Sequence, residues 1–181
     1  MSYVQKSADK SLRLGIIGLG YVGLPLALSY TSNGYHVTGF DIDAAKVNSL
    51  LEGNSYIEHI PSDSIKQARQ NGLLDATTDF SRAPEVDALI ICVPTPLDLH
   101  HEPDLSYVIG TLESIVPHLR AGQLVSLEST TYPGTTTEEV LPRVPTTGRK
   151  VRIYSVERIL TIKDIRSSCL ECRGADTLCR D

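Results

Sequence analysis

A glycine-rich turn between two patterned segments constrains the fold of this chain more than any other feature. Residues 18–23 read GLGYVG and directly follow the apolar run LRLGII, which has the character of a buried parallel strand. In such a G-x-G-x-x-G turn, Gly18 permits the tight bend, Gly20 lets the backbone approach a pyrophosphate, and Gly23 allows the next helix to pack closely on the strand. The helix N-terminus then offers free N–H groups and the positive end of its dipole to the phosphates.

An acidic residue after the next predicted strand, together with the glycine turn, matches the pattern of a dinucleotide-binding site. Residues 35–40 (YHVTGF) read as a strand followed by Asp41, 18 residues after the last glycine of the turn. A carboxylate there can accept a hydrogen bond from a ribose 2′-OH and would repel a 2′-phosphate, so the sequence predicts NAD rather than NADP. Tyr21 and Val22 join the predicted cofactor-binding residues. Lys46 is a further candidate, and the alternative interpretation of Lys46 is a solvated lysine on a helix. The alternative interpretation of the whole motif is a structural turn with an incidental acid.

Strand and helix patterns alternate along the body of the chain. The sequence predicts strands over residues 12–17, 35–40, 76–79, 87–93 and 123–129, and helices over 24–30, 44–51, 62–71, 105–119 and 135–141. This alternation predicts an α/β fold, a Rossmann-type doubly wound parallel sheet with helices on both faces. We assign the NAD-binding Rossmann domain to residues 12–142 and an N-terminal extension to residues 1–11.

The net charge and hydropathy pattern restrict the partners. The chain carries 17 Lys and Arg against 22 Asp and Glu, a formal net charge of −5. An acidic total without a long basic run argues against nucleic acid. No apolar stretch approaches the roughly 20 residues that cross a bilayer, and the N-terminus lacks the apolar segment of a secretory signal. We therefore expect a cytoplasmic protein with reduced cysteines and no membrane partner.

Three motifs in order point to one family. They are GLGYVGLPLA at residues 18–27, CVPTPL at 92–97 and ESTTYPGTTTEEVLP at 128–142. Together they resemble the N-terminal NAD-binding domain of the UDP-glucose/GDP-mannose dehydrogenase family, and the third motif most resembles the UDP-N-acetylglucosamine 6-dehydrogenase branch. The resemblance implies an NAD-dependent nucleotide-sugar 6-dehydrogenase. Such an enzyme oxidises the C6 alcohol of UDP-N-acetylglucosamine or UDP-glucose to a carboxylate, in two steps with two NAD, for polysaccharide precursor synthesis.

Two threonines take their roles from this resemblance. Thr95 follows the predicted strand at 87–93, between Pro94 and Pro96, which stiffen its loop. The matching family threonine contacts the cofactor, and a turn threonine without a ligand is the alternative. Thr130 matches a threonine that contacts NAD and helps to position a catalytic water, a task that suits a hydroxyl because it both donates and accepts hydrogen bonds.

The nucleophile of the family is absent from this sequence. In the family a cysteine in a Gly-Phe-Cys context forms a thiohemiacetal that becomes a thioester, and no such tripeptide occurs here. Residues 154–159 (YSVERI) are similar to a Tyr-Ser-Pro-Glu-Arg segment of the family, so Glu157 matches a catalytic glutamate. With Thr130 it is a candidate catalytic residue in a chain that we expect to be inactive alone. The first alternative is a non-catalytic NAD-binding module or inactive truncated fragment. The second alternative is another NAD oxidoreductase, such as a hydroxyacid dehydrogenase.

Residues 143–181 form an atypical basic C-terminal tail. They hold 9 Lys and Arg and 5 Asp and Glu, whereas residues 1–142 hold 8 and 17. The last 36 residues contain no proline but three of the four cysteines. The segment reads as a divergent or out-of-frame tail, a genuine replacement, or a stub of the missing central domain. Because the family dimerises through that domain, we expect this chain to be monomeric.

Two groups of possible metal ligands do not form a convincing site. The paired histidines at residues 100–101 are adjacent, so their side chains point in different directions. Cys169 and Cys172 with the third cysteine of the tail lack a fourth zinc ligand, and they lack the strand–helix setting of a redox pair. Cys92 lies inside a predicted buried strand and reads as a core residue. We therefore predict no metal site.

Overall fold

A six-stranded parallel sheet forms the centre of the computed structural model, which describes residues 3–97, 103–129, 131, 134–144 and 152–155. The strands are β1 (Arg13–Ile17), β2 (His36–Phe40), β3 (Leu74–Thr77), β4 (Ala88–Ile91), β5 (Leu124–Leu127) and β6 (Arg152–Ser155). They lie in the order β3-β2-β1-β4-β5-β6, which is the strand order of a doubly wound dinucleotide-binding fold. The predicted Rossmann-type α/β fold is confirmed.

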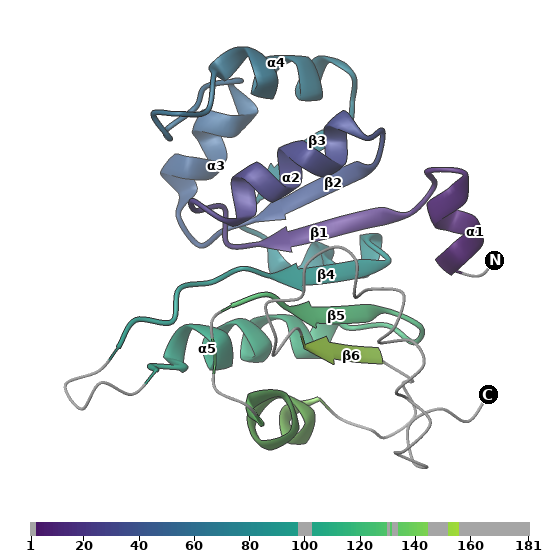
Figure 1. Cartoon of the computed structure of the whole chain (residues 1–181), viewed down its shortest axis with the longest axis vertical. Coiled ribbons are helices and arrows are strands. Elements are labelled where there is room, and N and C mark those ends of the chain that lie inside the picture. The colour runs from purple at the N-terminus through teal and green to yellow at the C-terminus, as the bar shows by residue number, and fades with distance from the viewer. Residues whose placement is uncertain (1–2, 98–102, 130, 132–133, 145–151, 156–181) are drawn as a thin grey trace.

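Helices cover both faces of the sheet (Figure 1). The α-helices are α1 (Tyr3–Ala8), α2 (Gly23–Ser32), α3 (Ala44–Leu51), α4 (Ser62–Gln70) and α5 (Ser106–Ile115). Short helical turns are η1 (Phe80–Glu85), η2 (Val116–His118), η3 (Thr136–Val140) and η4 (Leu141–Arg143). Helices α2, α3 and α4 contribute to one hydrophobic core, and α5, η1 and η3 contribute to the other.

Alternating side chains of the inner strands supply both cores. In β1, Leu14 and Ile16 face the α2 side and Ile17 faces the α5 side. In β4, Ile90 faces the α2 side and Leu89 faces the α5 side. Since both faces of a parallel sheet are covered, these strands consist almost entirely of apolar residues, which is why the sequence located them.

The predicted element ends differ from the structure where local hydrogen bonding decides them. The helix predicted over residues 105–119 ends as an α-helix at Ile115, because Pro117 has no N–H to donate and the chain continues as the 3₁₀ turn η2. The cap expected from Ser62 is absent, since its hydroxyl instead accepts the Ser55 N–H at 3.0 Å. Asp43 does cap α3, as predicted, by accepting the Ala45 N–H at 2.9 Å.

The sheet continues past residue 142, where the sequence ended the Rossmann domain. Strand β6 lies within the predicted tail and pairs in parallel with β5, with Leu124 opposite Arg152 and Leu127 opposite Ser155. The sheet of the structure therefore includes residues 152–155, beyond the predicted end of the domain at residue 142. The sequence did not indicate this strand, because it is only four residues long and lies in a segment of basic composition.

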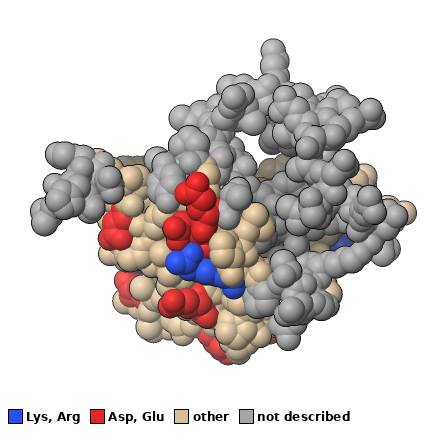
Figure 2. Space-filling view, turned by 90° about the horizontal axis from the view of Figure 1, so that it is seen from below, with Lys and Arg blue, Asp and Glu red and all other residues tan. Residues whose placement is uncertain are grey.

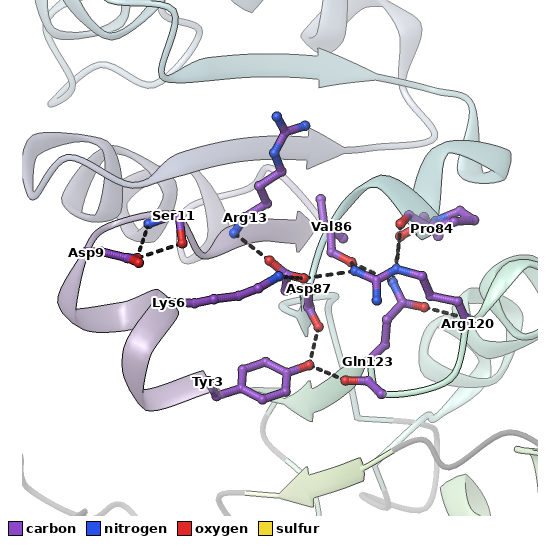
Figure 3. Close-up of polar contacts among 12 residues, drawn as sticks. Tyr3, Lys6, Asp9, Ser11, Arg13, Pro84, Val86, Asp87, Arg120 and Gln123 are labelled. Carbon is purple, nitrogen blue, oxygen red and sulfur yellow. Dashed lines mark hydrogen bonds and ion pairs between the residues drawn. The ribbon is translucent and has the colours of Figure 1, made fainter. Parts of the chain in front are cut away.

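The N-terminal extension forms helix α1, which lies at the amino-terminal edge of the sheet (Figure 3). Lys6 Nζ lies 2.7 Å from Asp87 Oδ1, just before β4, and Arg120 donates to the same oxygen at 2.9 Å. The backbone N–H of Arg13 donates to the other oxygen, Oδ2, at 3.1 Å. The Tyr3 hydroxyl donates to the Asp87 carbonyl at 2.8 Å. Asp87 therefore joins α1, β1 and the turn before β5.

The face of the molecule in Figure 2 carries both signs of charge, since acidic and basic side chains lie next to one another near its middle. No helix among the described residues is long and apolar enough to cross a membrane.

Candidate cofactor site

The glycine turn lies at the carboxyl edge of the sheet, and the surroundings of its three glycines differ. Gly18 has φ +89°, and a Cβ there would lie 2.7 Å from the Cys92 carbonyl oxygen. A Cβ on Gly23 would collide with the Gly18 carbonyl oxygen. A Cβ on Gly20 would meet nothing within 4 Å, so the space beside this residue is open. This is the arrangement that a closely approaching phosphate requires: a tight bend, close packing below and free access above.

The segment that leads into α2 presents open hydrogen-bond donors. The N–H of Leu24 donates to the Gly20 carbonyl at 3.1 Å. Within the described part of the chain, by contrast, the N–H groups of residues 20–23 have no acceptor. Tyr21 and Val22 are also exposed, with 75% and 60% of their surface accessible. A helix N-terminus with open N–H groups favours an anion, so these residues fit the pyrophosphate of a dinucleotide.

Asp41 is buried at the end of β2, with only 6% of its surface accessible. Its Oδ2 accepts the Leu19 N–H at 2.8 Å, and its Oδ1 accepts the Asp43 N–H at 3.0 Å. Lys46 Nζ lies 3.7 Å from the same Oδ2. The structure therefore places Asp41 and Lys46, two of the predicted cofactor-binding residues, next to each other. An ionised carboxylate has about four acceptor sites, and two remain for hydroxyl groups such as those of a ribose.

The loops after β4 and β5 meet the glycine turn at the same edge. The Cys92 N–H donates to the Ile17 carbonyl at 2.8 Å, and the Ser129 hydroxyl donates to the Val93 carbonyl at 2.7 Å. Thr95 follows two residues later and is partly buried. The predicted residues Thr130 and Glu157 lie outside the described residues. The edge thus gathers the glycine turn and Asp41 at the switch point of such a sheet, where a ligand site is expected.

Cys92 is a core residue, as the sequence predicted. It is buried, and burial together with the Glu128 carboxylate raises the pKa of its thiol to about 12. A thiol with this pKa is protonated at neutral pH and is a poor nucleophile. Among the described residues no group of His, Cys, Asp and Glu is placed to hold a metal ion.

Sequence reasoning missed Tyr56, which lies in the loop between α3 and α4. Its hydroxyl donates to the Leu19 carbonyl at 2.5 Å, and its ring packs against the core that α2 and α3 share. Burial raises the pKa of Tyr56, and the carboxylates of Asp41 and Asp43 raise it further. The contact joins residues 37 positions apart, so no local motif signalled it. A lone tyrosine in a polar loop is otherwise unremarkable.

Comparisons with known proteins agree with this geometry. Residues 12–159 match the model of the UDP-glucose/GDP-mannose dehydrogenase family, NAD binding domain. The chain is 36% identical over 133 residues to UDP-N-acetyl-D-glucosamine 6-dehydrogenase from Pseudomonas aeruginosa, covering 74% of this chain and 31% of that protein. It is 41% identical over 124 residues to UDP-N-acetyl-D-mannosamine dehydrogenase from Salmonella typhi, covering 68% and 29%.

Solved structures give the same picture. A ternary complex of GDP-mannose dehydrogenase from Pseudomonas aeruginosa matches with a TM-score of 0.75 and 30% identity, over 85% of this chain and 38% of that one. A UDP-N-acetyl-mannosamine dehydrogenase from Staphylococcus aureus matches with a TM-score of 0.70 and 31% identity, over 84% and 39%. The chain therefore spans about a third of the length of the relatives it matches.

Proposed function

The chain belongs to the UDP-glucose/GDP-mannose dehydrogenase family and contains its NAD-binding domain, and on that premise we propose that it is the cofactor-binding part of a UDP-N-acetylglucosamine 6-dehydrogenase. The Pseudomonas aeruginosa relative and the ESTTYPGTT motif support this sugar. UDP-N-acetylmannosamine is the second candidate substrate, because the Salmonella typhi relative is a dehydrogenase of that sugar. UDP-glucose remains the third candidate. In each case the reaction oxidises the C6 alcohol to a carboxylate.

One observation carries the proposal: the open glycine turn lies beside Asp41 on a sheet of dinucleotide-binding order. The N–H groups of residues 20–23 bind the pyrophosphate, and the free acceptor sites of Asp41 bind the adenosine ribose. Lys46 lies next to Asp41 and reduces its negative charge without replacing its acceptors. NAD, when bound, supplies the hydride acceptor for the sugar alcohol.

The other predicted residues complete the roles at this edge. Thr95 follows β4 and contacts the cofactor from the side opposite to Asp41 along the strand order. Thr130, two residues beyond the Glu128 that begins the loop after β5, contacts NAD and orients a water molecule. Glu157, two residues after β6, matches a catalytic glutamate of the family and is the second candidate catalytic residue. The roles of these three residues come from the family resemblance.

We also propose that the chain does not catalyse the reaction alone. It spans about 31% of the Pseudomonas aeruginosa relative, and neither of its two phenylalanines, Phe40 and Phe80, is followed by a cysteine. The thiol that would form the covalent intermediate is therefore missing from these 181 residues. Because the family dimerises through a central domain that these residues do not match, we propose that the chain is a monomer. We also propose that it works in the cytoplasm, with a UDP-sugar as the substrate of the whole enzyme.

The test measures NADH formation at 340 nm with the purified chain, NAD and each of the three UDP-sugars. We expect calorimetric binding of NAD and no NADH with any sugar. NADH formation would overturn the proposed dependence on a missing domain and would identify the sugar directly. Absence of NAD binding would overturn the cofactor-binding function itself, whereas binding without turnover in every longer form of the protein would favour a non-catalytic NAD-binding module.

The segment after residue 159 is proposed to be a divergent or out-of-frame continuation. Its support is the loss of proline and the concentration of cysteine, since Cys169, Cys172 and Cys179 all fall in the last 13 residues. Translation of the DNA across and beyond this segment in all three forward frames tests the proposal. A frame that encodes a Gly-Phe-Cys segment downstream is expected, and its absence from every frame would contradict an out-of-frame origin.

A further inference from the structure

Leu19, in the middle of the glycine turn, is held from three directions. Its N–H donates to Asp41 Oδ2 at 2.8 Å, and its carbonyl accepts the Tyr56 hydroxyl at 2.5 Å. Its side chain is fully buried over β2, where Gly39 makes the room: a Cβ on Gly39 would lie 2.7 Å from Leu19 Cδ2. A residue between two glycines would otherwise be free to change its backbone conformation, so these contacts define the turn.

The contact with Tyr56 also determines where the next N–H points. A peptide unit is planar, and the described chain contains no cis peptide bond, so the Leu19 carbonyl and the Gly20 N–H point in opposite directions. When the oxygen is held inward by Tyr56, the hydrogen is directed outward. The Gly20 N–H has no acceptor among the described residues, and the space beside Gly20 is open.

The opposite orientation of this peptide would be harmful to an anion. Rotation about the bonds that flank the Leu19–Gly20 peptide costs little on the glycine side, because Gly20 lacks a Cβ. A flipped peptide would direct a carbonyl oxygen toward the site and would repel a phosphate. Free donors therefore need a partner that selects one orientation, and among the described side chains only Tyr56 donates a hydrogen bond to this carbonyl.

We propose that Tyr56 is a positioning residue for NAD, whose hydroxyl holds the Leu19–Gly20 peptide so that the Gly20 N–H is presented to the pyrophosphate. The inference rests on the NAD-binding function. The phenol stays a donor across the physiological range, because burial and then the carboxylates of Asp41 and Asp43 raise its pKa. Tyr56 itself does not need to touch the cofactor.

The test compares Tyr56→Phe with Tyr30→Phe. The first keeps the ring and removes only the hydroxyl. The second is a matched control, because Tyr30 is also partly buried and packs against the same core, but within the described part of the chain its hydroxyl makes no hydrogen bond to the glycine turn. Calorimetry with the full chain measures the affinities for NAD and for ADP. Competition against NAD measures the affinity for adenosine, which has no phosphate.

We expect Tyr56→Phe to bind NAD and ADP about fivefold more weakly, the value of one hydrogen bond, and to bind adenosine as the wild type does. The Gly20 amide proton should shift downfield on NAD addition in the wild type and in Tyr30→Phe, but by less in Tyr56→Phe. Equal NAD affinity in all three proteins overturns the role of Tyr56 and leaves the proposed NAD-binding function intact. An equal loss for adenosine and ADP overturns it in favour of a structural role. Failure of the wild type to bind NAD overturns the proposed function as well.

Discussion

Exchanging the second or third glycine of the turn for alanine should separate cofactor binding from folding. The Gly20→Ala methyl group would enter open space, since nothing lies within 4 Å of it. The Gly23→Ala methyl group would collide with the Gly18 carbonyl oxygen and lie 3.2 Å from Ile16 Cγ2. A backbone oxygen cannot yield as the end of a flexible side chain can, so α2 would have to move away from β1.

The magnitudes follow from these two environments. For Gly20→Ala we expect no loss of stability and a gain of up to about 1 kcal/mol through the unfolded chain. Its methyl group occupies the approach of the pyrophosphate, and overpacking of about 1–3 kcal/mol corresponds to binding about 5- to 150-fold weaker. For Gly23→Ala the same overpacking falls on the fold. A cost of about 3 kcal/mol lowers the melting temperature by about 6–12 °C in a domain of this size.

Circular dichroism melts and NAD calorimetry on the two variants and the wild type provide the assay. The reasoning predicts a stable Gly20→Ala protein that binds NAD poorly and a destabilised Gly23→Ala protein. Wild-type NAD affinity in Gly20→Ala would refute the assignment of the open side of the turn to the cofactor. An equal loss of stability in both variants would refute the steric distinction between them.

Two further predictions concern the opposite edge of the sheet. Asp87→Asn should lower the free energy of unfolding by about 2 kcal/mol at pH 7, a value reduced from that of a fully buried pair because Lys6 and Arg120 are partly exposed. Although burial raises the pKa of Asp87, the hydrogen bonds from Lys6, the Arg13 N–H and Arg120 outweigh it, so the pKa is lowered. The contribution should therefore be complete above about pH 4 and decrease as the pH falls toward the lowered folded-state pKa. In urea titrations the difference in stability between the two proteins should be smaller at pH 3 than at pH 7, and a difference that persists undiminished at pH 3 would contradict this. Deletion of residues 1–10 should cost about 1–2 kcal/mol, because α1 buries no side chain fully and acts through these polar contacts, and should change NAD affinity less than twofold; a larger loss of NAD affinity would show that α1 communicates with the other edge.

The sequence was sufficient for the parts of the fold that rest on local patterns. The apolar runs of β1 and β4, the glycine turn and the Asp43 cap each follow from residues close together in the chain. Asp41 and Lys46 could both be assigned to the cofactor side, because a motif of known spacing contains the first of them and the second follows five residues later, in the first turn of α3.

The missed features depend on contacts between distant segments. Tyr56 acts on a carbonyl 37 residues away, and Lys6 reaches an aspartate 81 residues away. Neither residue stands in a pattern of its own. Strand β6 was missed for a related reason, because a four-residue edge strand has too few positions to show a period and is defined by its pairing with β5.

Calorimetric titration of the chain with NAD and with NADP tests the central claim most directly. The two dinucleotides differ only by a 2′-phosphate, which would have to lie beside the buried carboxylate of Asp41. We predict saturable one-to-one binding of NAD and at least about tenfold weaker binding of NADP, because a charge repulsion of about 1.4 kcal/mol has that effect. Tighter binding of NADP, or binding of neither dinucleotide, would contradict the account.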